Sequence, residues 1–202
     1  LPIYKKLQGD ERLIERAGGR TFRITGGGFW QVHKKAPDVL TSAVNQFIEK
    51  AGCLKLSADN LDLYGGVGLF TGTIAAKFGT ELRMTTVESF KQATADATLN
   101  LKDLPNVKAV CEPVERFLAP HKDETGEALV VLDPPRSGAG AKVVGQLIKL
   151  APKHIVYVAC DPVALARDLK TLLEHYDLDG IRAFDLFPHT HHVETIASLI
   201  RK

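Results

Sequence analysis

One cysteine of this chain stands where a protein can hold a nucleophile. Cys160 follows a short apolar run at 155–158 and precedes Asp161-Pro162. Aspartate is a good helix N-cap and proline is favoured at the first helical position, so we expect a strand before the cysteine and a helix after it. A thiol beside a helix N-terminus meets free N–H groups and the positive end of the helix dipole, which favour the thiolate. The pattern is compatible with a nucleophile and equally with a buried structural cysteine.

A carboxylate and three histidines follow near the end of the sequence. The segment 187–194 contains the histidines and ends in Glu194. Glu194 is either a surface acid or, if this segment folds toward Cys160, a general base. Zinc sites use histidine ligands, but no matching cluster of cysteines or carboxylates accompanies these three. The sequence therefore predicts no metal site.

A glycine-rich turn predicts a cofactor site. The predicted strand Asn60–Tyr64 leads directly into Gly65-Gly66-Val67-Gly68. Glu88 ends the next predicted strand about 20 residues later, which is the position of a carboxylate that bridges ribose hydroxyls. The glycine spacing departs from the G-x-G-x-x-G pattern that holds a pyrophosphate, so a nicotinamide dinucleotide is disfavoured. S-adenosylmethionine has a ribose and no phosphate, and it fits better.

A second polar turn follows another buried run. Asp133-Pro134-Pro135-Arg136 comes directly after the apolar residues 129–132. Two consecutive prolines stiffen the backbone and leave carbonyls without N–H partners. Such a turn, opposite the glycine turn, can grip the amino group of a cofactor or a planar base. Enzymes that methylate exocyclic amines usually have an aromatic residue after these prolines, and Arg136 stands there instead. The alternative is an ordinary rigid turn with a charged exit.

Regular elements alternate along most of the chain and must position these turns. Seven runs predict β-strands: Asn60–Tyr64, Leu82–Glu88, Val107–Cys111, Ala128–Asp133, Ile155–Ala159, Ile181–Leu186 and Thr195–Ile200. Helices are expected near 36–51, 69–78, 90–101, 113–118, 139–150 and 162–174. This alternation predicts an α/β, Rossmann-like fold with a mostly parallel seven-stranded sheet covered on both faces. Because no helix separates the last two strands, the last strand is expected to run antiparallel.

The first 35 residues have a different character. They carry eight basic and three acidic residues, a local charge of +5 against +2 for the whole chain. A hairpin is predicted between Leu13–Arg16 and Thr21–Thr25, followed by a short strand at Phe29–His33. We therefore expect a basic, β-rich leader at 1–35, the remnant of a central or RNA-binding domain, and a second domain at 36–202. A basic segment suits a polyanionic partner, although ordinary scatter of surface charge explains it as well.

Composition limits the remaining classes. The chain has 202 residues, 45% of them hydrophobic, which is enough for one α/β core and a short appendage. No run approaches the ~20 apolar residues of a membrane span, and no secretory signal is visible. Three widely spaced cysteines predict neither a disulfide framework nor an iron–sulfur cluster, so a cytoplasmic location is expected. Because the sequence opens at Leu1, it is interpreted as part of a longer protein.

Taken together, these motifs resemble the catalytic domain of the RNA uracil-5-methyltransferase family. The resemblance extends from Phe29 to the C-terminus and depends most on 157–168 and 187–194. It implies an S-adenosylmethionine-dependent enzyme that methylates uridine C5 in RNA, and the wording of 187–194 is more similar to the ribosomal RNA branch than to the transfer RNA branch. By resemblance, Cys160 is the nucleophile that adds to uracil C6 and Glu194 is the proton acceptor. The resemblance places cofactor contacts at Gln31, Tyr64, Gly65, Gly66, Gly68, Glu88 and Asp133.

Three residues depart from the family pattern. His33 and Asp161 stand where asparagine is common, and Gly65 replaces a frequent cysteine, an exchange expected to be harmless. A carboxylate beside the thiol disfavours the thiolate, so the pKa of Cys160 is expected to be higher than in an Asp161→Asn variant. An aromatic side chain, Phe29 or Trp30, is expected to stack on a flipped target base.

Two other functions stay open at this point. One is a module that binds S-adenosylmethionine or RNA without methyl transfer, which the short N-terminal part and the departures favour. Retention of both Cys160 and Glu194 argues against it, because simple binding needs neither. The other is a nicotinamide-dependent dehydrogenase, which the glycine spacing disfavours.

Overall fold

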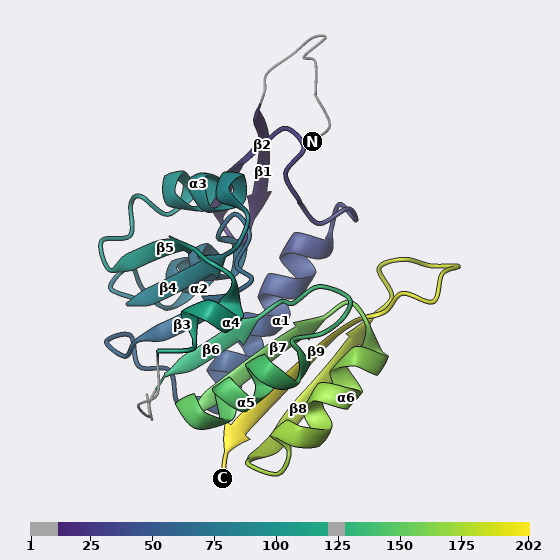
Figure 1. Ribbon diagram of the computed structural model, residues 1–202. Helices are drawn as coiled ribbons and strands as arrows, with labels where there is room; N and C mark the ends of the chain where they lie inside the picture. Colours follow the sequence, from purple (N-terminus) through teal and green to yellow (C-terminus); the bar gives the residue numbers. More distant parts are fainter. Residues whose placement is uncertain (1–11, 121–127) are drawn as a thin grey trace.

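The computed structural model describes residues 12–120 and 128–202, and its centre is one seven-stranded β-sheet (Figure 1). The order across the sheet is β5-β4-β3-β6-β7-β9-β8. The strands are β3 (Asn60–Leu63), β4 (Met84–Glu88), β5 (Val107–Cys111), β6 (Leu129–Leu132), β7 (His154–Ala159), β8 (Tyr176–Phe184) and β9 (Glu194–Arg201). Strands β3 to β7 pair parallel, and β9 pairs antiparallel with both neighbours. The predicted α/β fold with an antiparallel last strand is confirmed.

Helices cover both faces of this sheet (Figure 1). One face packs against α1 (Ala36–Ala51), α2 (Leu69–Phe78) and α3 (Lys91–Asn100). The other packs against α4 (Val114–Phe117), α5 (Gly140–Leu150) and α6 (Pro162–Leu172). Successive strand residues point to opposite faces, so in β6 Val131 enters the first core and Val130 the second. Burial on both faces explains why the central strands are continuous apolar runs.

The strand order places a switch point between β3 and β6. The chain proceeds outward from β3 through β4 to β5 and then crosses back to β6, on the other side of β3. At such a point the loops that follow the two strands diverge, one to each face of the sheet, and leave a crevice for a ligand. The glycine turn follows β3 and the double-proline turn follows β6. The two turns therefore flank the crevice.

The start of α6 follows the sequence expectation. Asp161 is the N-cap, with extended backbone, and its carboxylate accepts a hydrogen bond of 2.8 Å from the Ala164 N–H. Pro162 occupies the first helical position. The cap fixes the point at which the chain leaves β7, and with it the position of Cys160 between strand and helix.

The N-terminal hairpin forms, but the strand expected after it does not. β1 (Arg12–Ala17) and β2 (Arg20–Thr25) pair antiparallel in a separate two-stranded sheet. Residues 29–33, predicted as a strand, make no ladder, because Trp30 folds back onto Phe22 at a ring-centroid distance of 5.6 Å while its neighbours face outward. Residues 1–11 of the expected leader lie outside the described residues. The domain boundary at residue 36 stays a prediction.

The strand expected at 181–186 begins five residues earlier. β8 starts at the buried Tyr176, and its pairing with β9 shifts between Leu178 and Gly180. The irregularity interrupts the alternation of apolar and polar residues by which a strand is recognised. Within the described part of the chain, no helix is both long enough and apolar enough to cross a membrane.

Candidate active site

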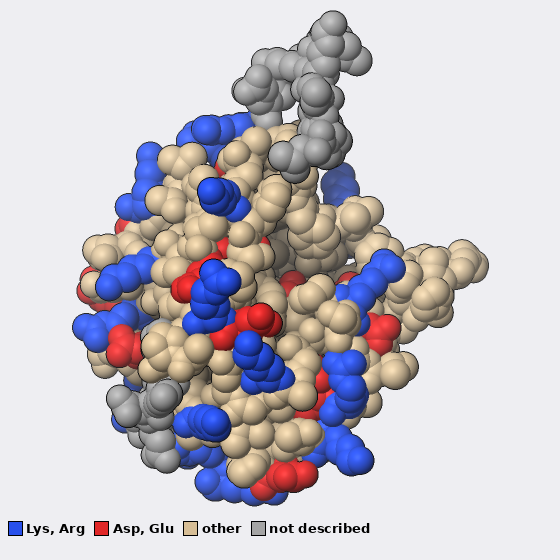
Figure 2. All heavy atoms as spheres, in the orientation of Figure 1, with Lys and Arg blue, Asp and Glu red and all other residues tan. Residues whose placement is uncertain are grey.

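Five strand ends meet at one edge of the sheet and bring the predicted residues into a row. In sheet order, β4 ends in Glu88, β3 leads into Tyr64, β6 into Asp133 and β7 into Cys160, and β9 begins with Glu194. Only the antiparallel direction of β9 puts its first residue at this edge. Figure 2 shows the surface hollowed between the hairpin and the loop that joins β8 to β9.

The glycine turn is fastened to β4. The Gly65 N–H donates to the Val87 carbonyl at 3.0 Å, and the Gly66 N–H donates to Glu88 Oε2 at 3.2 Å. The other oxygen of Glu88 accepts a hydrogen bond from the Phe90 N–H at 2.8 Å. Tyr64 adopts a positive φ of 61°, which turns the chain sharply at the end of β3. Glu88 thus orders the glycine turn with one carboxylate oxygen and the chain after β4 with the other.

Gly65 leaves no room for a side chain. A Cβ at this position would overlap Thr86 Oγ1 and come within 3.2 Å of Asp62 Oδ2. The cysteine that is frequent in the family therefore does not fit this backbone. This backbone therefore requires glycine at position 65, and the expectation that the exchange is harmless stays a prediction.

Gly65→Ala is expected to lower the free energy of unfolding by about 2 kcal/mol, because a methyl group is forced into a filled space. Urea denaturation measures the change. Removing the hydroxyl that it overlaps, in Gly65→Ala/Thr86→Ala, should restore part of the loss relative to Thr86→Ala alone. A Gly65→Ala protein as stable as the parent would contradict the packing described.

Asp62 is a functional candidate that the sequence interpretation missed. It is fully buried in β3, and its Oδ2 accepts hydrogen bonds from the Thr71 N–H at 3.1 Å and hydroxyl at 2.7 Å. Its Oδ1 has no hydrogen-bond partner. Burial raises the pKa of Asp62 to about 6, although the bonds from Thr71 lower it. An aspartate within a run of buried apolar residues was the available signal, since such a group needs a partner.

Asp133 is the most perturbed carboxylate of the row. Burial raises its pKa to about 8, and the charges of Glu194 and Asp62 add to the effect. Its own N–H donates to the Leu63 carbonyl at 3.2 Å, so the start of the double-proline turn is held by β3. Several carboxylates that disfavour one another's charge are a site for a cation.

Cys160 and Glu194 lie opposite each other. Ala159 pairs with Thr195, so the next residue on each strand, Cys160 and Glu194, continues the antiparallel register at the edge. Glu194 is buried, with 7% of its surface exposed. Burial raises the pKa of Glu194, and the charge of Arg136 lowers it. A buried carboxylate beside a thiol is placed to accept a proton.

The thiol of Cys160 is held in its protonated form. Burial raises its pKa, and the charges of Glu194 and Asp133 raise it further. A backbone hydrogen bond and the charge of Arg136 lower the pKa of Cys160, but by less than the other effects raise it. Any stabilisation of the thiolate by the helix N-terminus is therefore outweighed in the protein without ligands by burial and by the two carboxylates. The comparison with Asp161→Asn stays a prediction.

The remaining predicted residues lie in the segment between β2 and α1. Gln31 is half-buried there, and Phe29 is 70% exposed. Trp30 is packed against Phe22, which leaves Phe29 as the aromatic side chain free to meet a base. His33 Nδ1 accepts a hydrogen bond from the Lys35 N–H at 3.2 Å. Among residues 12–120 and 128–202, no group of histidine, cysteine and acidic side chains could hold a metal ion.

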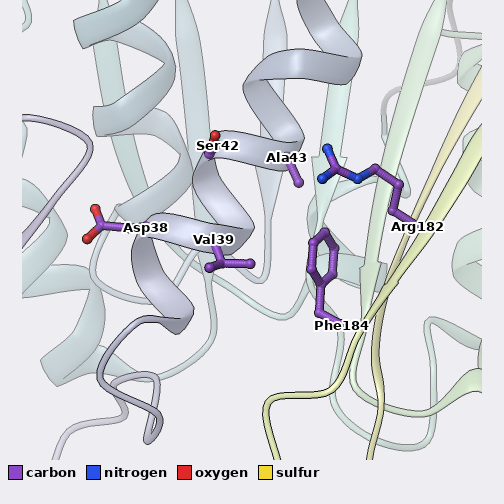
Figure 3. Close-up of a pocket in the computed structure, with 6 residues that line it drawn as sticks. All are labelled: Asp38, Val39, Ser42, Ala43, Arg182 and Phe184. Carbon is purple, nitrogen blue, oxygen red and sulfur yellow. The ribbon is translucent and has the colours of Figure 1, made fainter.

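A cavity of about 380 Å³ lies away from these residues, between α1 and β8 (Figure 3). The Arg182 guanidinium lies over the Phe184 ring, 5.2 Å from its centroid, and donates to Gln46 Oε1. The lining residues are Asp38, Val39, Ser42, Ala43, Arg182 and Phe184. None of the predicted site residues lines this cavity, so it is separate from the row at the sheet edge.

Known proteins resemble the chain in sequence and in fold. The family described as tRNA (uracil-5-)-methyltransferase matches residues 39–202. An uncharacterized RNA methyltransferase of Streptomyces avermitilis is 47% identical over 196 residues, which are 96% of this chain and 44% of that protein. The tRNA (uracil-54, C5)-methyltransferase of Pyrococcus abyssi, solved with S-adenosyl-L-homocysteine, is 30% identical with a TM-score of 0.77 over 96% of this chain and 45% of that one.

A more distant structure supports the fold alone. TYW2 from M. jannaschii, solved with AdoMet, has a TM-score of 0.60 and 16% identity, covering 98% of this chain and 90% of that one. The chain spans under half the length of the Streptomyces and Pyrococcus relatives. The family match covers most of the chain and includes every strand of the main sheet. The chain therefore belongs to the tRNA (uracil-5-)-methyltransferase family.

Proposed function

We propose that this chain is the catalytic part of an RNA (uracil-C5)-methyltransferase that uses S-adenosyl-L-methionine. The observation that supports it most is the register of β7 and β9, in which Ala159 pairs with Thr195 and the residues next to this pair are Cys160 and Glu194. One edge of the sheet then carries a nucleophile, a proton acceptor and a site for a cation. An RNA substrate places the reaction in the cytoplasm.

The crevice fits a cationic cofactor. S-adenosylmethionine supplies a methyl group on a positively charged sulfur, and it has an ammonium group as well. The unpartnered Oδ1 of Asp62 and the carboxylate of Asp133 are the groups to neutralise those charges. Glu88 is placed to bind ribose hydroxyls at the end of β4. Gln31, Tyr64, Gly65, Gly66 and Gly68 complete the proposed cofactor contacts.

Side chains of this protein account for the remaining steps. Once its proton has left to solvent, Cys160 Sγ forms a bond to uracil C6, and the electrons of the C5–C6 double bond move into an enolate. C5 of the enolate would take the methyl group as the bond between that group and the donor sulfur breaks, which leaves S-adenosylhomocysteine. C5 then bears both the methyl group and hydrogen, and Glu194 removes that hydrogen as a proton. The electron pair left at C5 expels the Cys160 sulfur from C6, which restores the ring and the free thiolate.

Cofactor binding is proposed to prepare the nucleophile. In the free protein the carboxylates of Glu194 and Asp133 hold the Cys160 proton in place. A cation bound among those carboxylates offsets their charge and lowers the pKa of the thiol. Attack on C6 is thereby confined to the protein that already holds the methyl donor.

Affinity for S-adenosylhomocysteine is expected to rise with pH. The raised pKa values of Asp62, about 6, and Asp133, about 8, mean that both carboxyl groups take up protons below those values. The ammonium group of the ligand favours the ionised forms, so protons must leave when it binds and the dissociation constant falls as pH rises. Calorimetry should show binding about tenfold tighter at pH 8 than at pH 6.5.

Asp133→Asn is the control for this pH dependence. The variant should bind more weakly than the parent at pH 8, with a dissociation constant that varies much less between pH 6.5 and 8. Binding by the parent protein that is independent of pH over this range would contradict the role given to Asp133.

Ribosomal RNA is the proposed substrate class, on the resemblance of 187–194 to that branch of the family. Transfer RNA is the alternative, because the solved Pyrococcus relative is a tRNA methyltransferase. Figure 2 shows lysine and arginine side chains spread among carboxylates on this face rather than gathered in one patch. We therefore propose that RNA docking depends largely on parts beyond this chain.

The second candidate function is a module that binds the cofactor without methyl transfer. It draws support from the chain's spanning under half the length of its relatives. One experiment separates the two functions. The protein is mixed with S-adenosylmethionine and with 5-fluorouridine-substituted ribosomal RNA fragments or tRNA transcripts, and intact mass is recorded. Fluorine cannot leave as a cation, so a methyltransferase stalls as a covalent adduct that includes the methyl group.

The outcome distinguishes both function and substrate. An adduct with ribosomal fragments supports the proposal, and an adduct with tRNA alone corrects the substrate class. If neither RNA forms an adduct while S-adenosylhomocysteine binds, the chain is either a binding module or a catalytic part separated from its RNA-docking half, and the same experiment on a longer form of the protein distinguishes these two.

A further inference from the structure

One buried carboxylate holds the far half of the double-proline loop. Asp168, in α6, is 3% exposed, and its Oδ2 accepts hydrogen bonds from the Ala139 N–H at 2.8 Å and the Gly140 N–H at 3.3 Å. These two residues lie where the loop after β6 enters α5. Asp168 ends the segment 157–168 on which the family resemblance depends, but neither the resemblance nor the proposed reaction gives it a role. A buried, fully partnered carboxylate outside the reacting groups calls for an explanation.

The same carboxylate is tied to the strand that ends in Cys160. The Tyr157 hydroxyl donates to Asp168 Oδ2 at 2.8 Å and accepts from the Ala139 N–H at 2.9 Å. Burial raises the pKa of Tyr157, and the bond to Asp168 raises it further, so the phenol stays a donor. Loop, strand β7 and helix α6 therefore share one hydrogen-bonded junction, three residues before the cysteine along β7.

A third set of contacts closes the junction from the loop side. Arg167 donates to Asp168 Oδ1 through Nε at 3.1 Å and Nη2 at 2.9 Å, and Nη2 also donates to the Ser137 carbonyl at 2.7 Å. Gly138 has a positive φ of 77°, and a Cβ there would approach Asp168 Oδ2 to 2.7 Å. The loop thus packs against the carboxylate along its backbone, with no space for a side chain between them.

The loop is held at two separate places. Its beginning, Asp133, is bound to β3 through the Leu63 carbonyl. Its end, from Ser137 to Gly140, is bound to Asp168 and Arg167. Arg136 lies between the two, and its side chain is exposed with no hydrogen bond that would fix it independently among the described residues. The position of Arg136 therefore depends on the Asp168 junction more than on β3.

We propose that Asp168 is a positioning residue for the reaction, which holds the loop so that Arg136 faces Cys160 and Glu194. The catalytic role of Asp168 rests on the proposed function, whereas the hydrogen bonds that hold the loop do not depend on it. The charge of Arg136 lowers the pKa of the Cys160 thiol and of the Glu194 carboxyl, and so opposes the effect of burial on both. Loss of the junction should thus remove a stabilising cation from the nucleophile while Asp133 stays in place for the cofactor.

Asp168→Asn tests the positioning role. Asparagine has the size of aspartate, but its amide cannot accept hydrogen bonds from all four groups that now donate to the carboxylate. The rate of Cys160 alkylation by iodoacetamide is measured against pH, with peptide mass mapping to distinguish the other two cysteines. We expect the rate at neutral pH to fall about tenfold, the effect of a weakened neighbouring cation. The dissociation constant of S-adenosylhomocysteine should stay within about threefold, since β3 still holds Asp133.

The sign of the change in alkylation rate distinguishes a positioning role of Asp168 from a direct effect of its charge on the thiol. Removing a negative charge near a thiol by itself favours the thiolate and would speed alkylation. Gly138→Ala disturbs the junction from the loop side without changing any charge, and it should slow alkylation as Asp168→Asn does. Leu169→Ala, a neighbouring core position in α6, controls for stability alone: it should lower the melting temperature and leave the alkylation profile unchanged.

Unchanged or faster alkylation in both Asp168→Asn and Gly138→Ala would overturn the proposal. Equal slowing in Leu169→Ala would overturn it too, because any loss of stability would then have the same effect. Alkylation requires no RNA and no methyl transfer. A chain that forms no adduct with RNA can therefore still confirm or refute the role of Asp168.

Discussion

Cys160→Ala is expected to abolish methyl transfer to RNA, with a loss of at least about a thousandfold in rate. Cys160 is the thiol of the row, whose other members are Tyr64 and the carboxylates Glu88, Asp133 and Glu194, so no other member of the row is suited to form the bond to uracil C6. The cofactor should still bind. Transfer of tritium from labelled S-adenosylmethionine to RNA measures the rate, and calorimetry with S-adenosylhomocysteine measures binding.

Cys111→Ala is the matched control. Cys111 is exposed at the end of β5, on the far side of β4 from the row, and its removal should leave the rate unchanged. A Cys160→Ala protein that retains more than a tenth of the parent rate would show that the methyl group reaches RNA without a covalent intermediate at this cysteine.

Glu194→Gln should have the second-largest effect, with turnover slowed by about a hundredfold to ten-thousandfold. The block comes after methyl transfer, since the proton at C5 then has no acceptor. The variant should accumulate a covalent complex with ordinary, unfluorinated RNA that includes the transferred methyl group. Intact mass detects it, and the parent protein should show none at the same time point.

The same substitution should make the thiol more reactive. The charge of Glu194 raises the pKa of both Cys160 and Asp133, so its removal lowers them. Iodoacetamide should therefore modify Cys160 faster in Glu194→Gln than in the parent. Glu81→Gln, an exposed position before β4, is the control and should change neither measurement. Fast turnover of Glu194→Gln without a trapped complex would assign the proton acceptor to another group.

Much of the fold was predictable because local and global signals agree. Apolar runs mark the buried strands β6 and β7, the Asp161-Pro162 pair begins α6, and the short link before β9 indicated its antiparallel direction. The errors occurred where pairing or packing partners decide the conformation. Residues 29–33 have strand-like composition, but Trp30 packs on Phe22 and no strand accepts them. The start of β8 is obscured by the irregular pairing near Gly180.

The candidate site was also predictable only in part. Cys160, Glu194, Glu88 and Asp133 were identified because each is a polar residue at the end of a predicted strand. Their electrostatics were not predictable, because the protonation of Cys160 is set by residues 27 positions before and 34 after it in sequence. A helix N-terminus is visible in the sequence, whereas burial and opposing carboxylates are visible only after folding. Asp168 was overlooked for the same reason: its four partners come from three different segments.

A protonated Cys160 also bears on how the protein withstands peroxide. Oxidation to sulfenic acid proceeds through the thiolate, so a thiol whose pKa is raised by burial and by two carboxylates is oxidised slowly. The nucleophile would then be preserved through oxidative stress while the protein is idle. Its exposure to such damage would be greatest in the short interval when the cofactor is bound and RNA has not yet arrived.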